Sequence, residues 1–212
     1  MIKKNLKTLI ITSVITILPI FAGLIMWNKL PEKMPTHWGF SGEVDGWSNK
    51  PFAIFFIPLF MLAIHLVCAV ATSIDPKNQG VNSKVFTLVL WICPVLSVVC
   101  MTASYAEALG MGVRVELIIP LIMGILFLII GNYLPKCKQN YTIGIKLPWT
   151  LNDEENWNKT HRFAGVVWTI CSIVIIIGSF FNKGAFYTTF PSLFVMVFAP
   201  LVYSYIYYRK HR

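Results

Sequence analysis

Histidine and cysteine offer the widest chemistry in this sequence, because both bind metals and both take part in catalysis. The four histidines do not match the spacing of metal-ligand motifs; they are His37, His65, His161 and His211. Four of the five cysteines lie in apolar segments, and no CxxC pair occurs. The HExxH, GxSxG, GxGxxG and phosphate-loop patterns are also missing from the sequence. We therefore expect no metal, no cofactor and no enzymatic activity.

Two polar features remain as candidate sites, His65 and the pair formed by His37 and Asp45. His65 is the only ionisable residue deep within an apolar segment, and such a residue inside a membrane is a candidate functional group. The alternative is a neutral imidazole that hydrogen-bonds a neighbouring helix, which the cost of burying a charge favours. His37 and Asp45 could form a small site if folding brings them together.

The composition indicates what kind of protein must position these residues. Charged residues make up 13% of the chain, hydrophobic residues make up 56%, and the mean hydropathy is +0.66. Soluble domains contain about 25% charged residues, and disordered chains combine low hydrophobicity with high charge. The net charge of +9 comes from short clusters between apolar segments, which argues against direct nucleic-acid binding. The sequence predicts a polytopic protein of the lipid bilayer.

Six apolar segments are long enough to cross the roughly 30 Å hydrocarbon core of a membrane. They cover residues 8–27, 52–72, 85–106, 117–134, 163–181 and 185–208. The predicted fold class is therefore an all-α integral membrane protein with six transmembrane helices.

The distribution of basic residues predicts the orientation, because Lys and Arg are enriched in cytosolic loops. With the N-terminus inside, 13 of the 18 Lys and Arg residues lie in cytosolic segments and five lie outside. We therefore expect a multi-pass protein of the bacterial plasma membrane with both termini in the cytosol.

Two connections between the predicted helices are long, 28–51 outside and 135–162 inside. Each follows the first helix of a three-helix half, so the halves 1–112 and 113–212 would have opposite topologies. Leu30-Pro31 and Leu134-Pro135 begin the two loops in the same way. This arrangement is typical of an inverted 3+3 repeat, although so few shared residues are also compatible with chance.

The two long loops carry most of the candidate contact residues. Prolines and glycines predict a compact, turn-rich structure for the extracellular loop, which either caps the helix ends or faces an extracellular ligand. In the cytosolic loop, Thr150 as N-cap predicts a short helix over 151–160. The cations and tryptophans of that loop suit either anionic lipid headgroups or a cytosolic protein.

The loops also resemble known families. The P-x-H-W…G…D-G pattern resembles a family of membrane domains of unknown function, and its residues here are Pro35, His37, Trp38, Gly42, Asp45 and Gly46. The second loop is similar to the SdpI family of bacterial immunity proteins. That pattern is matched by Gly131, Asn132, Leu134, Pro135, Lys136, Asn140, Gly144, Ile145, Pro148, Trp149, Thr150, Leu151, Trp157, Thr160, His161, Arg162 and Gly165. Lys146 stands where the pattern has Arg. Lysine keeps the positive charge but lacks the planar guanidinium that makes bidentate contacts.

This resemblance implies a plasma-membrane protein that protects a cell against a secreted, membrane-acting peptide toxin. Some relatives also hold a cytosolic ArsR-like repressor at the membrane. We expect a toxin-facing set of His37, Trp38, Asp45 and Trp47. The expected partner-docking set is Lys136, Asn140, Lys146, Trp149, Thr150, Trp157, His161 and Arg162. The alternative function is a small transporter or an efflux or flipping protein, although the spans lack deep acidic residues for ion coupling.

Overall fold

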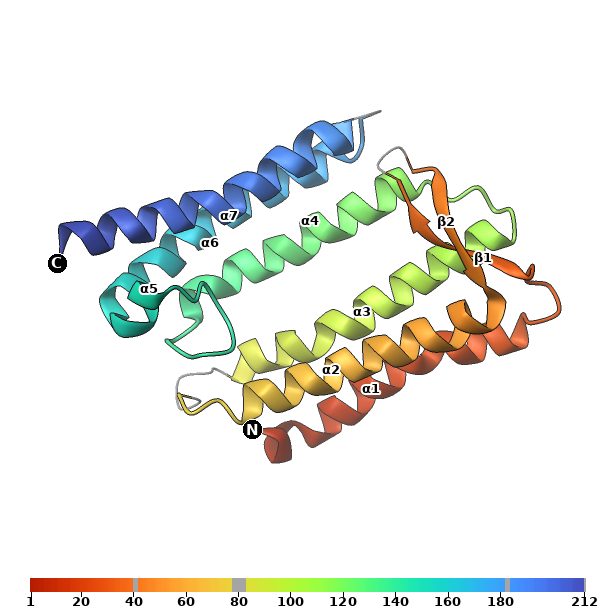
Figure 1. The fold of residues 1–212 in the computed structure, drawn as a ribbon, viewed down its shortest axis with the longest axis horizontal. Coiled ribbons are helices and arrows are strands. Elements are labelled where there is room, and N and C mark those ends of the chain that lie inside the picture. Colours follow the sequence, from red (N-terminus) through yellow and green to blue (C-terminus); the bar gives the residue numbers. More distant parts are fainter. Residues whose placement is uncertain (40–41, 78–82, 182–183, 212) are drawn as a thin grey trace. The chain divides into compact units, whose positions relative to one another are not determined.

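The computed structural model describes residues 1–39, 42–77, 83–181 and 184–211. Its elements, in chain order, are α1 (Ile2–Ile25), β1 (Lys33–Trp38), β2 (Val44–Asn49), the π-helical η1 (Phe52–Phe56), α2 (Ile57–Ser73), α3 (Ser83–Ala108), α4 (Val115–Tyr133), the 3₁₀ turn η3 (Leu134–Lys136), α5 (Pro148–Asn152), α6 (Glu154–Gly178) and α7 (Gly184–Lys210) (Figure 1). Among the described residues, six helices are long and apolar enough to cross a membrane, so the predicted fold class is confirmed. Lys183 and Arg212, which entered the orientation argument, lie outside the described residues.

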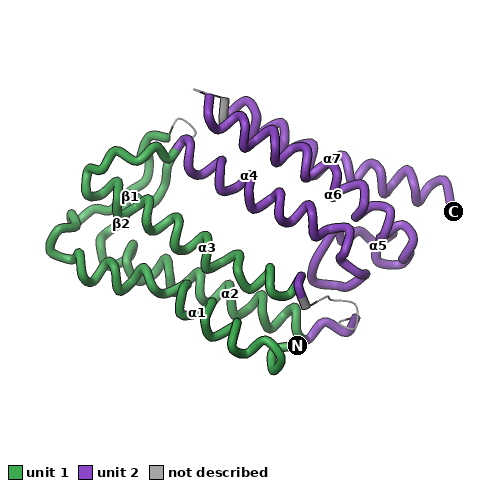
Figure 2. Tube along the Cα trace, turned by 180° about the vertical axis from the view of Figure 1, so that it is seen from behind, with its two compact units in different colours: residues 1–73, 86–115 green, residues 74–85, 116–212 purple. Residues whose placement is uncertain are grey.

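The chain forms two compact units, which Figure 2 shows in different colours. Unit 1 contains residues 1–73 and 86–115, and unit 2 contains residues 74–85 and 116–212. Residues 74–77, which follow α2, therefore belong to the second unit. The division into halves at residue 112 and the inverted repeat both stay predictions.

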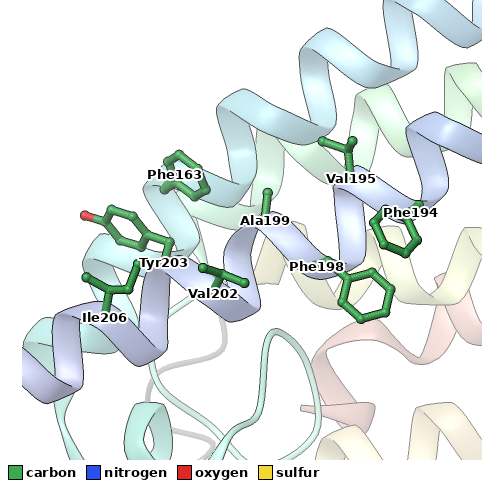
Figure 3. Close-up of a pocket in the computed structure, with 8 residues that line it drawn as sticks. All are labelled: Phe163, Phe194, Val195, Phe198, Ala199, Val202, Tyr203 and Ile206. Atoms are coloured by element: carbon green, nitrogen blue, oxygen red, sulfur yellow. The ribbon is translucent and has the colours of Figure 1, made fainter.

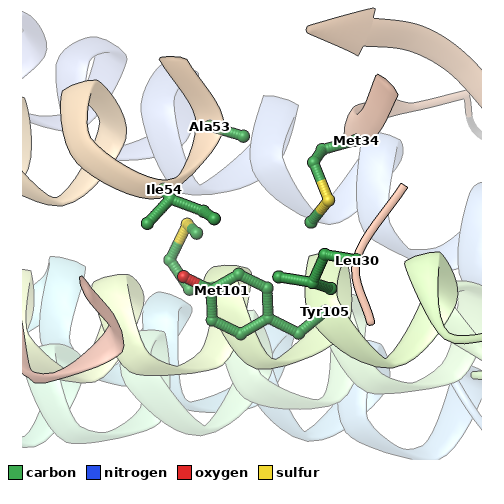
Figure 4. Packing of buried hydrophobic residues seen from close by; sticks show 6 residues of the cluster. All are labelled: Leu30, Met34, Ala53, Ile54, Met101 and Tyr105. Atoms are coloured by element: carbon green, nitrogen blue, oxygen red, sulfur yellow. The ribbon is translucent and has the colours of Figure 1, made fainter. Parts of the chain in front are cut away.

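Unit 1 packs α1, η1, α2 and α3 around a small apolar cluster below the hairpin. The cluster consists of Leu30, Met34, Ala53, Ile54, Met101 and Tyr105 (Figure 4). The Tyr105 hydroxyl crosses from α3 to α1 and donates to the Pro19 carbonyl at 2.8 Å. This approach requires glycine at Gly23, because a Cβ there would lie 2.6 Å from the same hydroxyl. The cluster fixes the helix ends from which the hairpin extends.

The predicted turn-rich loop contains an antiparallel β-hairpin, β1 paired with β2. Burial alternates along Val44–Asn49, as expected of a strand with one face packed. The register shifts around His37, and such bulges bend a strand and change where its side chains point.

Unit 2 is built on close crossings of α4, α6 and α7. A Cβ on Gly165 would lie 2.6 Å from Pro135 and 2.9 Å from the Gly131 carbonyl, so a larger residue could not fit there. Trp168 of α6 donates its indole N–H to the Met196 carbonyl of α7 at 3.0 Å.

The prediction of a separate helix over 151–160 is wrong. Helix α5 ends at Asn152, and α6 runs without interruption from Glu154 to Gly178. Asp153 is the N-cap, since its carboxylate accepts from the backbone of Glu155 at 2.9 Å and of Asn156 at 3.1 Å. Asp is among the strongest N-cap residues, while the Thr150 hydroxyl is engaged within α5 by the Leu147 N–H.

Candidate functional site

The hairpin brings His37 and Asp45 together, as the sequence suggested. The two strands place His37 Nδ1 2.5 Å from Asp45 Oδ1, and both side chains are exposed. Because a carboxylate only accepts, Nδ1–H donates and Nε2 stays available to a ligand. Gly46 permits this pairing, since a Cβ there would lie 2.7 Å from the Cβ of His37.

The two tryptophans of the hairpin have different surroundings. Trp47 shares the exposed positions of β2 with Asp45 and is 56% exposed. Trp38 is half-buried, and its indole N–H is buried without a partner within the described residues. An aromatic ring beside a polar pair is a common contact surface. Of the predicted toxin-facing residues, His37, Asp45 and Trp47 are thus available at the surface.

A buried lysine that the sequence analysis missed fixes the end of the hairpin to the turn that follows α1. Lys50 is 5% exposed, and its ammonium donates to the carbonyls of Leu30 at 3.0 Å and Trp27 at 3.3 Å. It also pairs with Glu32 at 2.9 Å. From α3, the Ser104 hydroxyl donates to the Pro35 carbonyl at 2.6 Å. Lys50 immediately precedes Pro51 and a predicted span, and this pattern alone does not distinguish a buried anchor from an interfacial cation.

His65 lies in the interior of unit 1. Its side chain is fully buried, and Nε2 lies 3.1 Å from the Thr12 hydroxyl of α1. That hydroxyl donates to the Thr8 carbonyl at 2.8 Å, so Nε2–H is the donor to Thr12. Nδ1 is buried and has no partner in the part of the chain that the structure describes. This geometry suits a neutral imidazole joining two helices, and a functional role for His65 stays a prediction.

Buried polar side chains connect the 135–162 loop to α6. Trp157 and His161, one turn apart on α6, stack with ring centroids 4.0 Å apart. The indole of Trp157 donates to the Cys137 carbonyl at 2.8 Å. His161 accepts the Ile145 N–H at Nε2, 3.0 Å away, so its proton lies on Nδ1 and is donated to the Trp157 carbonyl at 2.8 Å.

Glycine is required where the loop crosses this ring pair. Gly144 has a φ of +119°, a conformation that L side chains rarely adopt. A Cβ on Gly144 would collide with His161 Nε2 and lie 3.0 Å from the Trp157 ring. The loop backbone therefore lies directly against the two rings.

Asn140 and Thr150 hold the two ends of the loop. The Asn140 amide donates to the carbonyls of Lys138 and Ile143 at 2.8 and 2.9 Å and accepts from the Ile143 N–H at 2.6 Å. The Thr150 hydroxyl donates to the Ile145 carbonyl at 2.8 Å. We call the four buried residues Asn140, Thr150, Trp157 and His161 the loop frame.

Trp149 lies at the edge of the loop frame, against the end of α7. Its indole N–H donates to the Ser204 hydroxyl at 3.0 Å, and its ring packs on Tyr205 and Tyr208 with centroids 5.4 and 5.8 Å away. Asn156 of α6 donates to the Ser204 carbonyl at 3.1 Å. The half-buried Trp149 is thus held in one orientation by two helices.

Burial separates the predicted docking residues into two groups. Lys136, Lys146 and Arg162 are exposed and Trp149 is half-buried, whereas the loop frame is at most 1% exposed. A partner could contact the first group directly. The loop frame could act only by positioning that group.

The sequence analysis missed a connection from residues 75–77 to this loop. Asp75 is 4% exposed and accepts from the Tyr141 N–H at 2.8 Å and the Thr142 hydroxyl at 2.9 Å. It also accepts the Lys77 N–H at 2.9 Å, and the Lys77 ammonium donates to Gln139 at 2.8 Å. We call this the Asp75 clasp. Asp75-Pro76 is a turn signal, but Tyr141 and Thr142 lie more than 60 residues away in the sequence.

Cys137 is enclosed by the same loop. Burial raises the pKa of its thiol, and a hydrogen bond from Asn140 partly offsets that increase. A buried thiol with a raised pKa is unreactive. Among the described residues, no three His, Cys, Asp or Glu side chains gather as a metal site.

Comparison with known proteins identifies the family. Residues 136–204 match the SdpI/YfhL protein family, and residues 14–62 match a domain of unknown function, DUF1648. Immunity protein SdpI of Bacillus subtilis (strain 168) is 32% identical over 212 residues, which cover 98% of this chain and 97% of that protein. The chain belongs to the SdpI family. No solved structure matches it.

Membership of the SdpI family confirms the resemblance recognised in the two loops and the membrane immunity function that it implied. The SdpI/YfhL match begins at Lys136 and includes the whole loop frame, and the second match includes the hairpin. Both sequence signatures thus coincide with the two polar sites described above.

Proposed function

We propose that this protein protects its cell against a secreted, membrane-acting peptide toxin that meets the hairpin from outside. The observation that supports this most is the end-to-end similarity to Immunity protein SdpI. We infer a binding role rather than a catalytic one. The proposed orientation, with both termini in the cytosol, rests on the 13 of 18 basic residues in segments on that side.

The exposed hairpin face is the proposed toxin contact. Trp47 supplies apolar area, and the His37–Asp45 pair supplies a carboxylate oxygen and a free imidazole nitrogen. Lys50 and Ser104 hold this face on the helices, so little ordering is needed when a ligand binds. Preorganised aromatic residues of this kind commonly dominate binding energy.

Replacing Trp47 tests this contact. If Trp47 is a central contact, Trp47→Ala should weaken toxin binding by about 30-fold, the effect of a typical hot-spot residue. Cells carrying the variant should then be killed at correspondingly lower toxin concentration. Asn49→Ala is the matched control, because Asn49 is exposed on the same strand two residues away. Equal protection by the two variants at equal amounts in the membrane would exclude Trp47 as the contact.

A second proposed function is signalling through the 135–162 loop to an ArsR-like repressor. The supporting observation is that exposed cations and Trp149 stand on a rigid buried frame, which is suited to docking a protein. The repressor, not this protein, would contact DNA. Toxin binding outside would release or recruit it only if the two ligands favour different conformations.

A charge-neutralising variant separates signalling from immunity. Lys136→Gln combined with Lys146→Gln removes two exposed cations without touching the loop frame. A toxin-inducible reporter should lose its response while survival stays normal. Lys3→Gln combined with Lys4→Gln is the control, since it removes the same charge at the same predicted membrane face. Equal loss of response in both pairs would indicate nonspecific lipid contact.

A small transporter or an efflux or flipping protein remains the alternative function. Its best support is the buried His65, whose Nδ1 has no hydrogen-bond partner among the described residues, because intramembrane ionisable groups often carry protons. Toxin challenge with the proton gradient dissipated distinguishes the two. Protection by binding should persist, whereas gradient-driven transport should stop.

A further inference from the structure

A groove along α6 and α7 of unit 2 takes no part in the proposed function. Its volume is about 500 Å³, and it is lined by Phe163, Phe194, Val195, Phe198, Ala199, Val202, Tyr203 and Ile206 (Figure 3). Seven of these side chains are wholly apolar. The only polar side-chain atom in the lining is the Tyr203 hydroxyl.

Stacked rings hold the walls of the groove in place. Phe163 of α6 and Tyr203 of α7 stack with centroids 4.5 Å apart, and Phe194 packs against Phe198 in a tilted arrangement with centroids 4.3 Å apart. Ala199 lies between these ring pairs along α7, where its small side chain leaves room. The groove is therefore formed before any ligand arrives.

The stretch of the groove between Phe194 and Tyr203 has the length of one leaflet's hydrocarbon. Phe194 and Tyr203 are nine residues apart on α7, which corresponds to about 13–14 Å at the helical rise per residue. Half of the hydrocarbon core is about 15 Å thick. An acyl chain lying along this stretch would thus be about as long as the hydrocarbon of one leaflet is thick.

Cations follow the apolar lining at the end nearer the C-terminus. Arg209 and Lys210 come three and four residues after Ile206, so they continue the same face of α7. Both are exposed and make no ion pair or hydrogen bond within the described residues. Along this face the order is apolar groove, Tyr203 hydroxyl, and then two free positive charges.

We propose that this groove binds an anionic phospholipid. One acyl chain lies between Phe163 and Phe198, the Tyr203 hydroxyl meets the ester region, and Arg209 and Lys210 hold the phosphate. A helical peptide of the same length would need roughly 1,000 Å³ at the usual helix diameter, about twice the groove volume. The site itself does not depend on the proposed function, and only its assignment to the cytosolic leaflet rests on the proposed orientation.

The test measures lipids that stay bound to the purified full-length protein. Native mass spectrometry in detergent, with phosphatidylglycerol or phosphatidylcholine added, should show one retained phosphatidylglycerol and at least tenfold weaker retention of phosphatidylcholine. Arg209→Gln combined with Lys210→Gln should lower phosphatidylglycerol retention by about 10- to 30-fold. Ala199→Phe should remove retention of both lipids by filling the groove.

Matched controls identify the cause of any loss. Leu201→Phe enlarges a membrane-facing residue of α7 outside the groove, and Lys3→Gln with Lys4→Gln removes two other exposed cations. Both controls should retain phosphatidylglycerol as the parent protein does. Val202→Trp is a second groove-filling variant, for use if Ala199→Phe unfolds at lower temperature in lipid-free detergent.

Three results would overturn the proposal. Equal retention of the two lipids, insensitive to the groove-filling variants, would mean nonspecific lipid around the helices. If the parent protein forms dimers and Ala199→Phe abolishes them, the groove binds a second copy of the chain instead. If the groove-filling variants lose lipid but the Arg209 and Lys210 variant does not, these two cations do not hold the phosphate. A toxin challenge is not part of this test, so the proposal and the immunity function can fail separately.

Discussion

The Asp75 clasp gives the sharpest prediction, because a single atom can be changed without changing shape. In Asp75→Asn, one carboxylate oxygen becomes an amide NH₂, which donates where the original atom accepted. Asp75 accepts backbone N–H groups from both Lys77 and Tyr141. The one remaining oxygen of Asn can satisfy only one side of the clasp.

The expected cost follows from these hydrogen bonds. The variant loses charge-assisted bonds and leaves a partly buried backbone N–H of Lys77 or Tyr141 without its acceptor, which together cost about 2–3 kcal/mol. The Thr142 hydroxyl can rotate and accept from the new NH₂, so it adds little. A loss of this size raises the equilibrium constant for opening of the loop roughly 30- to 150-fold.

Cys137 provides the readout, because it is buried under the loop that the clasp holds. In a chain whose other four cysteines are replaced by alanine, the rate of thiol labelling at neutral pH reports how often the loop opens. We expect Asp75→Asn to raise that rate about 30- to 150-fold in purified protein.

Glu154→Gln is the control for this experiment. Glu154 is an exposed acid of the same region without a partner among the described residues, so the same chemical change should leave the labelling rate unchanged. An increase below about threefold in Asp75→Asn would mean that the clasp does not hold the loop. An equal increase in both variants would show that the effect comes from net charge.

Two further predictions concern the loop frame. Gly144→Ala should lower the free energy of unfolding, measured by thermal unfolding, by at least about 2 kcal/mol. Gly110→Ala is the matched control, since Gly110 has a φ of +70° but nothing lies within 4 Å of its added Cβ. Because burial raises the pKa of the Cys137 thiol, unfolded chains ionise first at this position. The contribution of this thiol to the free energy of unfolding should therefore be constant below pH 9.0 and fall above it. Cys137→Ala should abolish this fall, and an identical pH profile in that variant would refute the argument.

The six spans could be predicted because apolar length alone identifies a membrane helix. The sequence analysis predicted a turn-rich loop but not the two strands of the hairpin. Each strand is only six residues long, and they include Pro35 and Gly46, which weaken any strand pattern. Its site was partly predictable, since His37 and Asp45 were suggested as a pair that the structure brings together.

The loop frame shows what local patterns could not provide. Trp157 and His161 beside basic residues suggested a contact surface, whereas the structure buries both beneath Gly144. Asp75 and its partner Tyr141 are far apart in sequence, and nothing near Asp75 indicates that pairing. Burial of polar residues depends on such distant partners, so the docking set could not be divided into exposed and buried members from the sequence.

The orientation of the two sites across the membrane is the central claim, and single-cysteine labelling tests it most directly. Glu43 at the hairpin and Glu154 at the start of α6 are both exposed, and each can be changed to Cys in a chain without other cysteines. A membrane-impermeant thiol reagent applied to intact cells should label position 43 and leave position 154 unlabelled until the membrane is permeabilised. Labelling of position 154 but not position 43 in intact cells would contradict the account.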